Sequence, residues 1–215
     1  MLIIGLPHTG AMIEKRDSSE RLVMFTDAVA AIAITLLILP LLETVAEAPS
    51  FDELVHEHRA QFGALLLSFA VIFRFWWAHH RLFRHISRLS GWLVVWSAVW
   101  TFAIVLLPIP TAVISAFSSS AGTVFFYGAT LVLASGSLTA LALIAYRNPE
   151  LSEGRTPVPR DALLGNVTIF ATQALATAVG CIFADRVNYW AFFLMFLTGP
   201  IERVVRRRWR SAPAA

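Results

Sequence analysis

Six long apolar runs constrain this chain more than any other feature of its sequence. They cover residues 22–42, 62–83, 92–114, 122–146, 162–184 and 189–205. The hydrocarbon core of a bilayer is about 30 Å thick, so a helix needs about 20 mostly apolar residues to cross it. Because lipid leaves every backbone polar group to be satisfied within the protein, each run is expected to form a helix. The sequence therefore predicts an all-α integral membrane protein with six transmembrane helices.

Composition excludes the main soluble classes. Hydrophobic residues make up 57% of the chain and charged residues only 14%, whereas a soluble domain usually has about a quarter of its residues charged. The positive residues lie in clusters between the apolar runs, which suits membrane topology better than a nucleic-acid-binding face. We therefore expect neither a soluble enzyme nor a nucleic-acid partner.

The positive residues also predict the orientation. The tail before the first run, the second and fourth loops and the C-terminal end carry fourteen of the seventeen Lys and Arg residues, whereas the first loop is acidic. Cytoplasmic loops are enriched in Lys and Arg, so both termini are expected in the cytoplasm. We divide the chain into a cytoplasmic leader (1–20), a six-helix membrane domain (21–205) and a basic tail (206–215).

Two prolines lie near the outer end of the third run. Pro108 and Pro110 each lack a backbone N–H donor, so the helix is expected to kink or end there.

The first run has one informative face. At 100° per residue, with Ile32 at zero, Leu36 lies at about 40° and Leu39 at about −20°. The stripe that they share, about 100° wide, comprises Phe25, Ala28, Ile32, Thr35, Leu36 and Leu39. Taken alone, such a stripe is more often an ordinary helix-packing surface.

Asp27 points away from this stripe, and an acid within a membrane helix usually has a partner or a function. Asp27 lies ~9 Å inward from Arg21, and Arg74 lies ~10 Å inward from Arg81. At similar depth, Asp27 and Arg74 are predicted to share a buried polar cluster with Thr26 and with His79 or His80. Alternatively, Arg74 extends to the inner membrane surface without pairing.

Three motifs in order resemble the transmembrane protein 175 family of endolysosomal potassium channels and their bacterial relatives. The first is Arg21, three residues, then Phe25-Thr26-Asp27 and a helix rich in Ile, Thr and Leu. The others are Trp-Trp-Ala-His-His-Arg-Leu-Phe at 76–83 and Leu-Pro-Ile-Pro-Thr at 107–111. Thr26 replaces the family's usual serine, which keeps the hydroxyl but adds a methyl group.

The resemblance implies a homotetramer around a central pore lined by the first helix of each subunit. The family's hydrophobic constriction then corresponds to Ile32, Leu36 and Leu39, and its selectivity-linked hydroxyl to Thr35. Four apolar side chains around an axis form a dry ring that gates by dewetting and cannot coordinate an ion. Since the sequence has no Thr-Val-Gly-Tyr-Gly filter motif, selectivity for potassium is expected to be modest.

The resemblance also implies a packing and hydrogen-bond network near the second and third helices. Phe25, Thr26 and Asp27 are its members by resemblance, and the region of His79 and His80 contributes to it. The polar network expected for this chain also includes Arg21 from the first motif and Arg74 from the depth argument above.

The predicted function is passive conduction of potassium through a multi-pass protein of the cell (plasma) membrane. The expected partners are potassium ions, the lipid bilayer and further copies of the chain. We expect no cofactor, and no metal beyond potassium passing through the pore. A secondary transporter or a proton-permeable membrane protein is the alternative. A membrane-embedded enzyme ranks third, because we find no catalytic set in the sequence.

Overall fold

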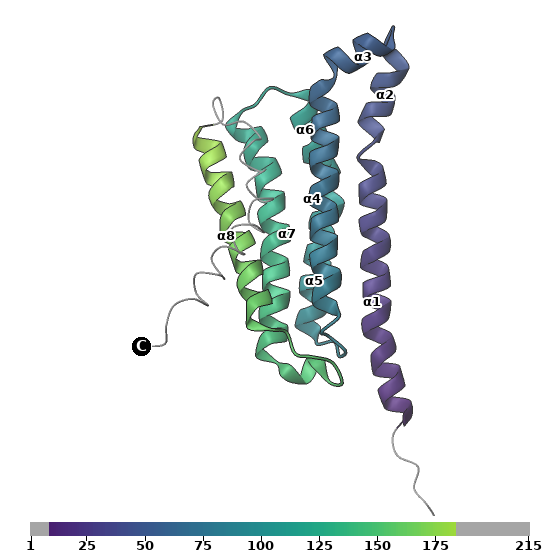
Figure 1. Cartoon of the computed structure of the whole chain (residues 1–215), viewed down its shortest axis with the longest axis vertical. Coiled ribbons are helices and arrows are strands. Elements are labelled where there is room, and N and C mark those ends of the chain that lie inside the picture. The colour runs from purple at the N-terminus through teal and green to yellow at the C-terminus, as the bar shows by residue number, and fades with distance from the viewer. Residues whose placement is uncertain (1–8, 184–215) are drawn as a thin grey trace, which may run out of the picture.

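The structure is a computed structural model that describes residues 9–183, with side chains from Ser18 onward. Every regular element in this range is a helix (Figure 1). The elements are α1 (Thr9–Leu36), α2 (Leu39–Glu47), α3 (Phe51–Glu57), α4 (Arg59–Phe83), α5 (Gly91–Leu106), α6 (Pro108–Ala116), α7 (Ala121–Arg147), the 3-10 turn η1 (Pro149–Ser152) and α8 (Arg160–Ile182).

Five segments of the described chain are long and apolar enough to cross a membrane. They are Ser18–Glu47, Arg59–Phe83, Gly91–Ala116, Ala121–Arg147 and Arg160–Ile182. The first five predicted spans are thereby confirmed. The sixth run (189–205) and the basic tail (206–215) lie outside the described residues. Because α1 begins at Thr9, the helix extends back into the residues expected to form the leader.

The long helices form one bundle. α7 packs against α5 and α8, while α1 packs against α4 and α5 at one edge of the bundle (Figure 1). Large side chains fill the space between them: Phe75 of α4, Trp100 of α5 and Tyr127 of α7 are fully buried. The core therefore lies between α4, α5 and α7, and α1 covers one side of it.

Two of the spans are broken by proline. α5 ends at Leu106 and α6 begins at Pro108, which confirms the expected interruption. The first span also breaks, which was not predicted: α1 ends at Leu36 and α2 begins at Leu39, with Pro40 in its first turn. Pro40 has no N–H to donate to the carbonyl four residues earlier, so α1 cannot continue through it.

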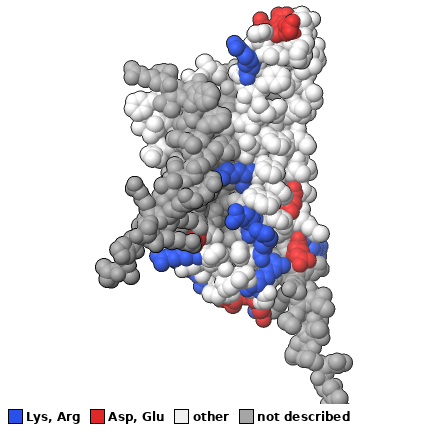
Figure 2. Space-filling model, viewed as in Figure 1, with Lys and Arg blue, Asp and Glu red and all other residues white. Residues whose placement is uncertain are grey.

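The charged residues separate towards the two ends of the bundle. The start of α1, the α4–α5 loop and the α7–α8 loop lie at one end (Figure 1). Most of the Lys and Arg side chains in view lie towards this end, with some acidic ones among them, and acidic side chains of the α2–α3 region lie at the other end beside a basic one (Figure 2). The fold thus brings together the positive segments that the sequence places in separate loops. We call this the basic end.

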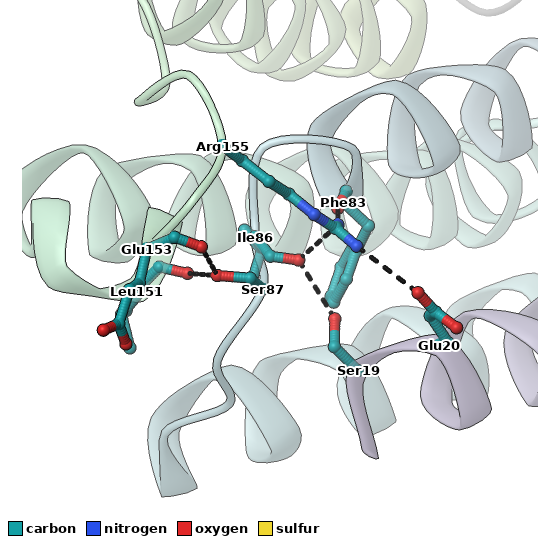
Figure 3. Close-up of polar contacts among 8 residues, drawn as sticks. All are labelled: Ser19, Glu20, Phe83, Ile86, Ser87, Leu151, Glu153 and Arg155. Atoms are coloured by element: carbon teal, nitrogen blue, oxygen red, sulfur yellow. Dashed lines mark hydrogen bonds and ion pairs between the residues drawn. The ribbon is translucent and has the colours of Figure 1, made fainter. Parts of the chain in front are cut away.

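Arg155 joins three segments at the basic end (Figure 3). Its guanidinium donates to the carbonyl oxygens of Phe83 (2.9 Å) and Ile86 (2.7 Å) and lies 3.7 Å from a carboxylate oxygen of Glu20. The Ile86 carbonyl also accepts a hydrogen bond from the buried Ser19 hydroxyl of α1 (3.1 Å). The α7–α8 loop is therefore tied to the end of α4 and to α1.

Replacing Arg155 should destabilise the bundle. Arg155→Gln removes two charge-assisted hydrogen bonds to carbonyls at the end of α4, so we expect a loss of about 1.5–3 kcal/mol in the free energy of unfolding. Arg88→Gln is the control, because the Arg88 side chain pairs with the exposed Glu153 at 2.9 Å, and such pairs contribute about 1 kcal/mol or less. Thermal unfolding of the purified proteins measures the difference; equal midpoints for the two variants would contradict the assignment.

Candidate functional site

The predicted stripe on α1 faces away from the rest of the subunit. Phe25 is 58% exposed, Ile32 59%, Leu36 40% and Leu39 49%. The opposite side of the first span is buried against its own subunit, through Thr26, Ala30, Ala33, Leu37 and Leu41. Intramolecular helix packing therefore does not account for the stripe. Its apolar side chains are available to lipid or to another subunit.

The proline break changes the geometry at the outer end of the stripe. Leu39 belongs to α2, beyond the turn at Leu37 and Ile38, so its angle cannot be extrapolated from Ile32 at 100° per residue. Leu39 nevertheless stays exposed.

Thr35 lies on this exposed side. Its hydroxyl donates to the carbonyl oxygen of Ile32 at 2.8 Å. Because the proton points back along the helix, the lone pairs of the hydroxyl oxygen stay available as acceptors. Thr35 can therefore present an oxygen to a cation, beside the apolar side chains of Leu36 and of Ile32, which lies about one turn earlier.

Asp27 lies on the side of α1 that meets α4. One carboxylate oxygen accepts a hydrogen bond from the indole N–H of Trp76 at 2.8 Å. The other lies 3.6 Å from Nδ1 of His80, a separation at which protonated histidine forms an ion pair. An acid within the first span thus has a donor and a titratable neighbour on α4.

The structure corrects the predicted pairing of Asp27 with Arg74. Asp27 contacts Trp76 and His80, whereas Arg74 lines a pocket between α4 and α8. The reason is the direction of each side chain around the α4 axis. Trp76 and His80 are separated by about 40° of rotation, whereas Arg74 lies about 160° from Trp76. Residues at one depth can therefore face opposite sides of the helix.

The other expected network members have separate environments. Thr26 is buried and donates to Val23 of its own helix at 2.9 Å. His79 is buried between the rings of Phe83 and Trp100, at centroid distances of 4.4 and 4.1 Å. Arg21 and Phe25 are exposed. Of the predicted set, His80 lies beside the Asp27 carboxylate.

Sequence reasoning missed Trp76 as the donor to Asp27. A signal was present, because Trp76 precedes His80 by four residues and so lies on the same face of α4. Glu20 and Arg155 were also missed; with Asp27 and His80 they line a cavity of about 330 Å³ beside α1.

Neutralising Asp27 should weaken the contact between α1 and α4. Asp27→Ala leaves the half-buried Trp76 N–H without its acceptor, and a hydrogen bond to a charged group contributes about 1.5–3 kcal/mol. Asp27→Asn keeps an acceptor oxygen, so it is expected to retain more of the stability. Size-exclusion chromatography after graded heating measures both effects. A fully stable and active Asp27→Ala protein would refute the role given to Asp27.

These helices and their apolar surfaces define a multi-pass helical membrane protein. Residues 21–108 match the model of the family described as TMEM175: Endosomal/lysosomal potassium channel TMEM175. Over this part, which is less than half of its length, the chain is similar to the TMEM175 family. The matched residues include α1 from Arg21 onward, α4 and α5, and thus both the exposed stripe and the Asp27 contacts.

Curated proteins of the same family are also similar to this chain. The chain is 33% identical to a potassium channel of Chamaesiphon minutus over 115 residues, 49% of this chain and 55% of the relative. It is 28% identical to the mouse endosomal/lysosomal proton channel TMEM175 over 141 residues, 64% of this chain and 28% of that protein. The matches thus span about half the length of the bacterial relative and a smaller share of the mouse protein.

A solved structure has the same fold. The crystal structure of a lysosomal potassium-selective channel TMEM175 homolog from Chamaesiphon minutus superposes with a TM-score of 0.61. The superposition covers 86% of this chain and 98% of that chain, at 19% identity. At this identity the likeness extends to the fold alone.

Proposed function

We propose that this chain is the subunit of a homotetrameric, potassium-permeable cation channel whose central pore is lined by α1. The observation that carries the proposal is the exposure of the Ile32, Leu36 and Leu39 side chains on the face of the first span opposite its own bundle. The match of residues 21–108 to the model of a potassium channel family supports it, as does the name of the bacterial relative, a potassium channel.

The constriction is formed by apolar side chains. Four copies of Ile32 and Leu36 around an axis exclude water, and ions cross only when the ring is wetted. Thr35 supplies an acceptor oxygen next to this ring, which favours a partly dehydrated cation. Such a pore discriminates weakly between potassium and sodium, because no ring of backbone carbonyls replaces the hydration shell.

The membrane orientation follows from the basic end. Cytoplasmic loops carry an excess of Lys and Arg, so the basic end faces the cytoplasm and the acidic α2–α3 region faces outward. The acidic region raises the local concentration of cations at the outer mouth. With a sixth span at 189–205, both termini are cytoplasmic, and we assign the protein to the cell membrane.

Potassium flux from liposomes containing the purified protein tests the proposal. A channel passes potassium down its gradient without saturating in the physiological range, whereas a secondary transporter saturates and couples to a second gradient. Recording single channels in potassium against sodium then gives the selectivity. Saturable, gradient-coupled uptake with no unitary currents would overturn the channel assignment.

Proton permeation is the second candidate, because the mouse and rat relatives are named proton channels. A pH-sensitive dye enclosed in the same liposomes distinguishes the two ions. Potassium stays our first choice, since the bacterial relatives named potassium channels share 33% and 34% identity with this chain, against 28% for the mouse and rat proteins.

A further inference from the structure

A polar pocket of about 290 Å³ lies between α4 and the beginning of α8, on the side of α4 that faces away from Asp27. Its lining includes Arg74, Trp77, Arg81 and His85 from α4 and the loop after it. From α8 come Asp161 and Asn166. The contacts that anchor Asp27 use none of these residues.

The two arginines of the pocket lie on one face of α4. Arg74 and Arg81 are seven residues apart, so they lie within about 20° of each other and ~10 Å apart along the axis. Arg74 is partly buried and Arg81 is exposed. The positive charge therefore extends from the end of the helix at the membrane surface into the depth of the span.

His85 adds a donor at the rim of the pocket. Its Nδ1 lies 2.8 Å from the carbonyl oxygen of Thr156. Since a carbonyl can only accept, Nδ1 carries the proton in this contact. The contact also attaches the α4–α5 loop to the loop that leads into α8.

The α8 side of the pocket is the start of a helix. Pro159 precedes α8 and makes no side-chain cap, and the backbone N–H groups at a helix start attract anions. Among the described residues of the lining, Asp161 is the one acidic side chain, against two arginines. Arg74 and Asp161 each already take part in an interaction within the protein, so a ligand would add to these contacts or compete with them.

We propose that this pocket binds a phosphate group, either that of an anionic phospholipid headgroup at the cytoplasmic surface or soluble phosphate. Two guanidinium groups offer the forked donors that phosphate oxygens accept. Trp77 is 47% exposed beside them, and indole rings favour the level of the lipid headgroups. The proposal does not depend on ion conduction, because the described lining of the pocket includes no residue of the α1 stripe.

Thermal unfolding of the full chain in detergent tests the site with three ligands. These are dioctanoyl-phosphatidylglycerol, dioctanoyl-phosphatidylcholine and inorganic phosphate. Phosphatidylglycerol should raise the unfolding midpoint more than phosphatidylcholine does. Arg81→Gln should require about tenfold more of the anionic lipid for the same shift, and Arg81→Lys should require less than that, because it keeps the charge but loses the fork.

Arg84→Gln is the matched control. Arg84 is an exposed arginine three residues further along the chain that lines the cavity beside α1 instead, so its variant should respond as the wild type does. A rise in the unfolding midpoint with inorganic phosphate that is lost in Arg81→Gln identifies soluble phosphate as a sufficient ligand. A rise with phosphatidylglycerol but not with phosphate identifies the lipid headgroup. Equal shifts in all the proteins would overturn the proposal, as would the absence of an Arg81-dependent shift with phosphatidylglycerol and with phosphate.

Discussion

Ile32→Asn and Leu36→Asn are expected to raise potassium flux through the reconstituted protein. Each change places four amide side chains where four apolar ones exclude water, so the constriction stays wetted and the barrier to ion passage falls. A fall of about 1.4 kcal/mol corresponds to a tenfold higher rate. Single-channel recording measures the change as a larger unitary conductance, which separates it from a change in the number of active channels.

Leu175→Asn provides the matched control for Leu36→Asn. Leu175 is an exposed leucine (65%) on α8, at the opposite edge of the bundle from α1 (Figure 1). The same substitution there should leave the unitary conductance unchanged. Wild-type conductance in both the Ile32 and the Leu36 variants would show that the α1 stripe is not the constriction.

Gly128→Ala is expected to destabilise the packing of α7 against α8. A methyl group at Gly128 would meet three side-chain atoms of Thr177, closer than van der Waals contact allows. Thr177 is buried and branched at Cβ, so it has little room to move. Overpacking of this kind costs about 1–3 kcal/mol, and the unfolding midpoint of the purified protein should fall accordingly.

Two variants separate this clash from the general effect of alanine in a helix. Gly122→Ala lies on the same helix, where the nearest atom would be the Ser120 hydroxyl oxygen at 3.8 Å, so it should be neutral or stabilising. Adding Thr177→Ala to Gly128→Ala removes the hydroxyl and methyl groups from the contact and should restore part of the stability. A Gly128→Ala protein as stable as Gly122→Ala would contradict the close approach.

The spans could be predicted because hydrophobicity over about 20 residues is a local property. Each of the first five apolar runs coincides with a helical span of the structure, and Pro108 marks the break between α5 and α6 as expected. Pro40 gives an equally local signal for the break after α1. The prediction of one helix over residues 22–42 did not use this signal and was wrong there. That error is one of interpretation, since the residue was visible in the sequence.

The stripe on α1 was also a local property, because helical periodicity determines which side chains share a face. Which of its faces a helix buries depends instead on its neighbours. The structure buries Ala30 and Ala33 and leaves Ile32 and Leu36 exposed, which small residues at a close helix contact make possible. Periodicity alone could not separate an outward stripe from a packing surface.

The partners of Asp27 show the same division. Depth along each helix follows from residue counting, and it correctly indicated that Asp27 and the end of α4 could meet. The rotation of α4 about its axis was not available from counting, so Arg74 was chosen where Trp76 and His80 hold the carboxylate. The sequence by itself determined the membrane class, the first five spans and the members of the α1 stripe. Only the tertiary structure decided which helix faces meet, because that choice depends on the packing of all the helices at once.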